Sequence, residues 1–431
     1  MQTRFQRAAC GVVLAALAAL PPITARGQSG TGEQEPRYEF GAQLRARAET
    51  RNGGGDNPTK QDAFGITRLR FDATLRPTRQ VRVFVEAQDS RVQGFAPGRN
   101  SRPLEDPVDI RQGYVALGRE DGPLTLFVGR RELAFVDERL IGIRNWNNIS
   151  PAWDGSELVL RRGKDSVTLL AVTQVDISDG LDPPSRTRWV YGAVGVIGSG
   201  LGGHELEPFY FTSRRPLDMA SNLGGELRTA GSRLSGLFAE TWDYQVILAG
   251  QRGGAGNRRQ NAWMGVWALG KTLEQRRLRP RLGVEWSYAS GDSDPQDERI
   301  GTFDTLFSSP HRIYGEQDIV GLRNLRALKT GIELHPSGTW QINVDFLDFR
   351  LASRYDGLYQ TNFVARVHAP PGGASSTHIG SELDFVLRYA PVPKVEVRFG
   401  VSRFMAGQFV LREVPGGGSQ TFLNTALLVN L

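Results

Sequence analysis

The chain has 431 residues, with 52 basic and 46 acidic side chains and a formal net charge of +6. Its single cysteine, Cys10, lies near the N-terminus, so a chain processed beyond that point has no disulfide and no cysteine-ligated metal site. Each of the 51 glycines disfavours a helix interior by about 1 kcal/mol relative to alanine. The composition therefore argues against long helices and favours strands.

The first 27 residues have the pattern of a secretory signal peptide. Arg4 and Arg7 precede an apolar run from Ala8 to Leu20, and residues 25–27 offer small side chains for cleavage. The run is shorter than the roughly 20 residues of a spanning helix. We expect cleavage after Gly27, a polar linker over residues 28–36 and a single domain over residues 37–431.

A two-residue alternation begins at Tyr38 and continues to Glu49. The even positions are apolar or aromatic, whereas the odd positions include Arg45, Arg47 and Glu49. A strand separates these two sets onto opposite faces, and a helix would mix them. Ile66–Arg76 and Val81–Gln88 repeat the pattern around Pro77-Thr78, which predicts a hairpin.

The same pattern continues through the chain. We predict further strands at Tyr114–Leu117, Leu124–Gly129, Glu157–Arg162, Val167–Val175, Trp189–Ile197, Glu207–Thr212, Asp243–Ala249, Ala262–Leu269, Arg281–Ser290, Ala327–Leu334, Gln341–Phe349, Asn362–Val367, Glu382–Tyr389, Glu396–Phe404 and Phe422–Leu431. With the first three these make about eighteen strands, with sixteen as the alternative count.

The polar faces of these strands are rich in arginine and carboxylate over about ten residues, the length of a tilted outer-membrane strand. The sequence therefore predicts an all-β fold, a transmembrane antiparallel up-and-down β-barrel. We expect it in the outer membrane of a Gram-negative bacterium, in contact with lipid and lipopolysaccharide. Composition alone leaves a soluble β-rich periplasmic protein open.

The predicted connections alternate between short and long. In outer-membrane barrels short turns face the periplasm and long loops face outward. Pro77-Thr78 and Gly118–Pro123 are short, and Gly291–Asn324 is the longest predicted outer loop.

Arginine dominates the positive charge, since only five of the 52 basic residues are lysine. Its planar guanidinium group binds carboxylates and phosphates bidentately. Such a lumen would attract anions; alternatively, arginine–carboxylate ladders simply hold a wide barrel together. The arginines on strand polar faces are Arg45, Arg47, Arg68, Arg70, Arg82 and Arg398.

Other motifs give no site. Gly198–Gly203 fits a dinucleotide-binding glycine pattern, but Pro208 limits the helix that must follow, so we predict a hairpin turn. We interpret Asp292, Asp294, Asp297 and Glu298 as a solvated acidic loop rather than a Ca²⁺ site. No nucleophile motif accompanies the five histidines. We therefore expect no enzyme, no cofactor, no metal and no nucleic-acid partner.

Two longer stretches resemble the alginate-export family of outer-membrane barrels. One runs from Gly129-Arg130-Arg131-Glu132-Leu133 through Asn145-Trp146-Asn147 to Trp153-Asp154-Gly155, and the other from Ser290-Gly291-Asp292 to Asn324. The resemblance implies an 18-stranded barrel that passes an anionic uronate polysaccharide through an arginine-rich constriction. Carried over by position, it places Arg131, Asp137, Arg139, Arg144 and Asp154 in or near that constriction. Arg45 and Arg70 join them through the alternation.

We therefore expect a passive channel for anionic solutes, either small anions or an alginate-like polyuronate, with periplasmic export proteins as further partners. The alternative is a plugged structural or adhesion barrel that binds a partner through long extracellular loops. A barrel lipase or protease, the third hypothesis, would need a serine or aspartate beside a histidine at the rim.

Overall fold

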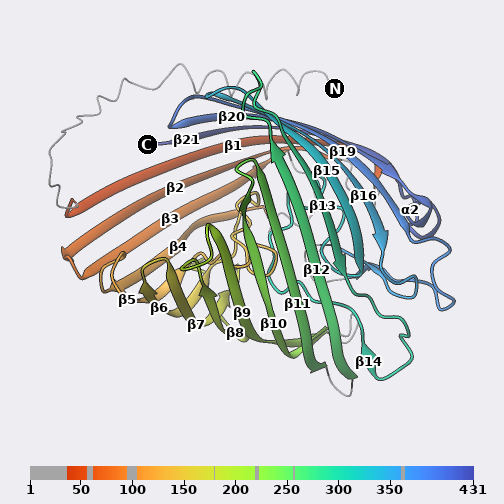
Figure 1. Ribbon diagram of the computed structural model, residues 1–431, viewed down its shortest axis with the longest axis horizontal. Coiled ribbons are helices and arrows are strands. Elements are labelled where there is room, and N and C mark those ends of the chain that lie inside the picture. The colour runs from red at the N-terminus through yellow and green to blue at the C-terminus, as the bar shows by residue number, and fades with distance from the viewer. Residues whose placement is uncertain are drawn as a thin grey trace.

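The computed structural model is a β-barrel whose long tilted strands surround a lumen (Figure 1). The structure describes residues 36–55, 62–94, 104–178, 180–218, 223–255, 258–360 and 365–431. The expected signal peptide, residues 1–27, and residues 28–35 of the expected linker lie outside the described residues.

A 19-stranded sheet forms the wall, and one of its members, β14 (Arg299–Ile300), is a short segment paired in parallel with β12. The other eighteen are antiparallel to both neighbours, and pairing of β1 with β21 closes the barrel. They are β1 (Tyr38–Gly55), β2 (Asp62–Thr78), β3 (Val81–Gln93), β4 (Asp106–Leu117), β5 (Leu124–Arg131), β6 (Trp153–Arg162), β7 (Asp165–Val175), β8 (Pro184–Val196), β9 (His204–Asp218), β10 (Leu223–Phe238), β11 (Trp242–Ala255), β12 (Arg258–Thr272), β13 (Arg281–Ala289), β15 (Leu325–Ser337), β16 (Trp340–Leu351), β19 (His378–Val392), β20 (Val395–Ala406) and β21 (Gly418–Asn430).

The two faces of the strands differ as the alternation predicts. In β1, Arg45 and Arg47 are buried inside the barrel, whereas Phe40 is 81% exposed on the outside. In β2, Arg68 is 1% exposed and Phe71 56% exposed. The outer face is therefore an apolar surface, as lipid contact requires.

Connections at one end of the barrel are short, such as residues 79–80 and 163–164, and both ends of the described chain lie there. The connections at the other end include the long ones. By the usual rule for such barrels the short-turn end faces the periplasm. The turn between β8 and β9 contains Gly198–Gly203, so the hairpin-turn interpretation of that glycine pattern is confirmed.

One predicted strand lies outside the barrel wall, and one long strand of the wall was not predicted. Of the predicted strand Asn362–Val367, only Ala365–Val367 (β18) is described as strand, and it pairs with β17 (Leu358–Tyr359) in a separate two-stranded sheet. The missed strand is β10. Its sequence carries glycine, serine and arginine on both faces, so it lacks the clean apolar face on which the prediction depends.

Two long segments fold into the barrel rather than away from it. We call residues 132–152 the first inserted segment and residues 301–324 the second. The Phe307 N–H donates to Leu140 O at 2.7 Å, and the Gly142 N–H donates to Phe307 O at 3.1 Å, so the two segments pair with each other.

The inserted segments share one apolar cluster with inward side chains of the wall. Leu140, Ile141 and Phe303 are fully buried in this cluster together with Ile247 of β11 and Phe349 of β16. The prediction that Gly291–Asn324 forms an outer loop is therefore wrong for residues 301–324. Burial of their apolar side chains stabilises the folded state by roughly 25 cal/mol for each Å² of apolar surface removed from water.

Helix α2 (Gln408–Glu413) connects β20 to β21 and buries Phe409 and Val410. With six residues it is far below membrane-spanning length, and no other helix in the described part of the chain reaches that length with an apolar sequence.

Candidate functional site

A group of arginines covers one side of the lumen. We call Arg45 and Arg47 of β1, Arg68 and Arg70 of β2, and Arg111 of β4 the arginine wall; all five side chains are buried. They lie on strands that are neighbours or near-neighbours in the sheet. The register of β1 and β2 places Arg45 directly opposite Arg68.

The first inserted segment crosses the lumen to this wall. Arg45 donates from Nη1 to Asn145 O at 2.5 Å and from Nη2 to Asn147 O at 2.8 Å. Arg68 donates from Nη2 to the Asn145 Oδ1 at 2.9 Å. Residues 145–147 therefore supply backbone and side-chain acceptors to both guanidinium groups.

Trp146 is the centre of this contact. Its ring stacks on His311 of the second inserted segment, with centroids 4.0 Å apart and an interplanar angle of 8°. The guanidinium carbon of Arg47 lies 3.6 Å from the indole centroid, and that of Arg398 lies 4.7 Å away. Arg47 also donates a short hydrogen bond to Trp146 O. Cation–π contacts of this kind contribute about 0.5–2 kcal/mol.

An ion pair and a hydrogen bond hold the second inserted segment against the barrel wall. Glu316 forms a close ion pair with Arg398, and the Glu316 N–H donates to the Glu382 Oε1 at 2.7 Å. Burial of Glu316 opposes its ionisation, but electrostatic interaction with His311 and Arg398 outweighs burial and lowers its pKa. Glu316 therefore carries a negative charge at neutral pH that the folded lumen stabilises.

Four arginines in this region have no carboxylate within 4.0 Å among the residues that the structure describes: Arg45, Arg68, Arg144 and Arg312. Arg144 directly precedes Asn145 and donates from Nε to Ser308 O at 2.7 Å. Burial lowers its pKa to about 10, so it remains cationic at neutral pH. Arg312 follows His311 and is exposed. The surroundings of Trp146 thus hold an excess of positive charge.

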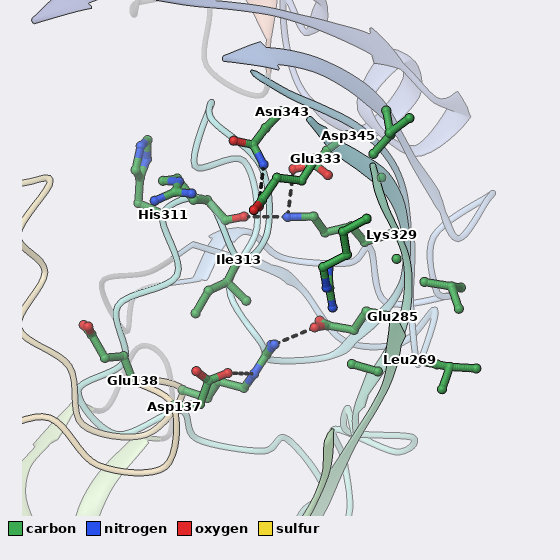
Figure 2. Close-up of a pocket in the computed structure, with 18 of the residues that line it drawn as sticks. Asp137, Glu138, Leu269, Glu285, His311, Ile313, Lys329, Glu333, Asn343 and Asp345 are labelled. Atoms are coloured by element: carbon green, nitrogen blue, oxygen red, sulfur yellow. Dashed lines mark hydrogen bonds and ion pairs between the residues drawn. The ribbon is translucent and has the colours of Figure 1, made fainter. Parts of the chain in front are cut away.

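A cavity of about 450 Å³ lies between the inserted segments and the wall formed by β12, β13, β15 and β16 (Figure 2). Its lining includes Arg281, the first residue of β13, which places it toward the short-turn end. Charges of both signs meet in it: Arg139 pairs with Glu285 at 2.6 Å and Lys329 with Asp345 at 3.1 Å. Exposed Arg312 also borders this cavity.

The seven residues predicted from the sequence fall into separate places. Arg45 and Arg144 contact the region around Trp146, as described. Asp137 and Arg139 line the cavity and pair with each other at 3.4 Å. Burial opposes the charge of Arg139, but Glu285, Tyr314 and Asp137 together raise its pKa.

The remaining three predicted residues lie in ion pairs on the barrel wall. Arg70 is 3.5 Å from Glu132, and Arg131 forms a close pair with Glu157. Asp154 accepts from Arg130 Nε at 2.8 Å.

Trp146, His311 and Glu316 were not among the residues predicted for the site. All three stand within the two family-like stretches, and that resemblance was the only available signal for them. Their proximity depends on two segments far apart in the sequence, so no local pattern could show it.

Comparisons with known proteins agree with this architecture. The family model described as "Alginate export" matches residues 37–423. No curated protein matches the sequence significantly.

Three solved structures from Pseudomonas aeruginosa are similar in fold. OccK11 (OpdR) is 12% identical with a TM-score of 0.60, and the match covers 91% of this chain and 96% of that one. OpdK with vanillate is 11% identical with a TM-score of 0.61, covering 91% and 99%. OccD3 (OpdP) is 10% identical with a TM-score of 0.61, covering 96% and 96%.

One of the similar structures is titled as an outer membrane protein, OpdK. The family match and the barrel fold together indicate an outer-membrane channel and favour transport over enzymatic activity. Because the family model covers nearly the whole chain, this protein belongs to the alginate export family.

Proposed function

We propose that this protein is a passive outer-membrane channel for anionic solutes and that its main substrate is an alginate-like polyuronate. The observation that carries the proposal is the excess positive charge around Trp146, where Arg45, Arg68, Arg144 and Arg312 have no carboxylate partner in the described residues. A polyuronate presents one carboxylate on every sugar, which suits guanidinium groups spaced along its path.

The arginines would act in two ways. Arg45 and Arg68 are buried beneath residues 145–147 and contribute a positive field rather than direct contact. Arg312 is exposed and Arg144 half-buried, so these two are the proposed contacts for sugar carboxylates.

The paired residues among the predicted site would form a ladder of weak sites. Arg70, Arg131 and Arg139 each face a protein carboxylate, and Asp137 and Asp154 are carboxylates in such pairs. A resident carboxylate competes with the sugar carboxylate and keeps each site weak enough for release. Conduction requires this balance between entry and exit.

The similar barrel OpdK was solved with vanillate, an aromatic carboxylate. That complex supports a carboxylated solute for this fold. In the same proposal, residues 1–27 are removed on export, lipopolysaccharide surrounds the barrel, and periplasmic export proteins deliver the polymer at the short-turn end.

Planar-bilayer recording tests the proposal. We expect anion-selective current in the wild type and block by a uronate oligosaccharide but not by a neutral glucan. Each lost charge-assisted contact is worth about 1.5–3 kcal/mol, so the double variant Arg144→Ala/Arg312→Ala should weaken uronate block at least roughly tenfold. Arg228→Ala is the matched control, because Arg228 is exposed and, among the residues that the structure describes, forms an ion pair with Glu226 alone.

A cation-preferring pore unchanged by the double variant, and by Arg131→Ala and Arg139→Ala, would overturn the proposal. Equal block by uronate and neutral glucan would overturn its substrate class.

A plugged structural or adhesion barrel is the second candidate, and the buried inserted segments favour it. Leu306 and Ile319 of the second segment are fully buried inside the barrel. This candidate predicts negligible wild-type conductance that appears only after residues 301–324 are deleted. The same recordings therefore separate the two candidates.

A further inference from the structure

Three aspartates converge at the end of the barrel that carries the long connections. Asp106 and Asp109 lie at the start of β4, and Asp182 lies in the connection between β7 and β8. One carboxylate oxygen from each lies within 4.8 Å of the others, and all three residues are buried. We propose that these aspartates bind a Ca²⁺ ion at the outer rim of the barrel.

Asp106 is the strongest indication of a ligand. The residue is 3% exposed, and its Oδ1 has no hydrogen-bond partner. Within the described residues its side chain makes neither a hydrogen bond nor an ion pair. Burying a carboxylate without a partner is costly, and such groups are rare in folded proteins. A cation in the space between the three aspartates would supply the missing partner.

The local charge is also unbalanced. Arg130 is 3.6 Å from the Asp109 Oδ2 and 2.8 Å from the Asp154 Oδ1, and its Nη2 donates to Asp182 O at 2.6 Å. This guanidinium is therefore already shared by the carboxylates of Asp109 and Asp154. Arg111 of β4 is engaged in a close pair with Glu132.

The donor set selects the kind of ion. All three side chains offer carboxylate oxygens, with neither histidine nor cysteine in the group, so a hard cation is favoured over a transition metal. Ca²⁺ binds oxygens at about 2.3–2.6 Å in flexible geometry, so two ligands of one ion can lie up to about 5 Å apart. Mg²⁺ demands a tighter and nearly octahedral shell.

The ion would also have a structural consequence. Pairing of β4 with β5 begins only at Gly113 and Arg130, so the end of β4 that carries Asp106 and Asp109 projects beyond that ladder. The Asp182 N–H donates to the Asp109 Oδ1 at 3.0 Å across this gap. Ca²⁺ would add ionic bonds there and fix the connection after β7 to the end of β4.

Calorimetric titration of the full-length mature protein tests this proposal. The protein is refolded in detergent free of lipopolysaccharide, treated with EDTA, dialysed and titrated with CaCl₂ and separately with MgCl₂. We expect one Ca²⁺ per chain with a Kd of about 10⁻⁴–10⁻³ M, the range of extracellular calcium modules, and weaker Mg²⁺ binding.

Asp106→Asn and Asp182→Asn should each weaken Ca²⁺ binding at least tenfold. Asp297→Asn should not, since Asp297 is exposed in another connection at the same end of the barrel. Asp182 lies outside the strands, so its variant tests the site even where Asp106→Asn impairs folding, which heat-modifiable gel migration would reveal. Absence of saturable Ca²⁺ binding in the wild type, or undiminished binding in the Asp182 variant, would overturn the site; equally tight Mg²⁺ binding would overturn the choice of ion.

Discussion

The ring of Trp146 stacks on the imidazole of His311 with centroids 4.0 Å apart, and this contact joins the two inserted segments inside the barrel. Trp146 reaches the arginine wall through Arg47, and His311 lies 3.1 Å from Asp318 through Nδ1. The stacked pair therefore links the β1 side of the lumen to the second inserted segment. We infer that it controls how closely the segments approach each other.

Replacing Trp146 with alanine should widen the path. The change removes the stack, worth about 0.5–1.5 kcal/mol, and two cation–π contacts of similar size. We expect a higher single-channel conductance and about tenfold weaker block by a uronate oligosaccharide in planar bilayers. Trp263→Ala is the control, since Trp263 is exposed on the outer face. Conductance and block equal to the wild type would show that the stack does not limit passage.

Acid should loosen the second inserted segment through Glu316. Burial opposes the charge of Glu316, but His311 and Arg398 lower its pKa below the unfolded value of about 4.3. A depressed folded pKa gives stability that is present above pH 4.3 and is lost as pH falls through the folded value. Recordings between pH 7 and pH 3 should therefore show conductance that rises only below the unfolded value of about 4.3.

Glu316→Gln isolates this effect from the other carboxylates in the lumen. The variant lacks the titrating charge, so it should show the raised conductance already at pH 7. A variant that kept the low conductance and acid transition of the wild type would assign the transition to another group. Glu413→Gln serves as the comparison, because Glu413 lies in helix α2, outside both inserted segments, and accepts hydrogen bonds from Ser375.

The backbone at Gly129 should not tolerate a side chain. Gly129 has φ +128°, and a β-carbon there would lie 2.3 Å from Gly113 O on the neighbouring strand. We expect Gly129→Ala to lower the free energy of unfolding by about 1–3 kcal/mol, measured by urea titration in lipid vesicles. Gly250→Ala is the matched control, because no atom lies within 4 Å of its added β-carbon. Equal midpoints for both variants would contradict the prediction.

Strands with two chemically distinct faces could be predicted from the sequence, and those without them could not. In β1 the polar inward residues and the apolar outward residues alternate over residues 38–49, and the structure confirms both faces. In β10 the outward positions include Arg228 and Ser232, so the pattern fails although the strand pairs fully with β9 and β11. Hydrogen bonding to neighbouring strands, rather than the local sequence pattern, determines that such a segment is a strand.

Some features of the candidate site could likewise be predicted from the sequence, and others could not. The alternation placed Arg45 and Arg70 on the inward face, because the direction of a strand side chain depends only on its position in the strand. The alternation could not show that the carbonyls of Asn145 and Asn147 accept hydrogen bonds from Arg45, or that Trp146 stacks on His311. These contacts join segments distant in the sequence.

The sequence by itself determined the class of this protein: alternation of period two, arginine on the polar face and connections of unequal length fix an outer-membrane barrel. These features are local, and each is set by neighbouring residues. Only the tertiary structure decided that residues 132–152 and 301–324 fill the lumen, which arginines stay without a carboxylate, and that Asp106 meets Asp182. Those outcomes depend on which surfaces meet when the barrel closes, because burial and ion pairing act through space rather than along the chain.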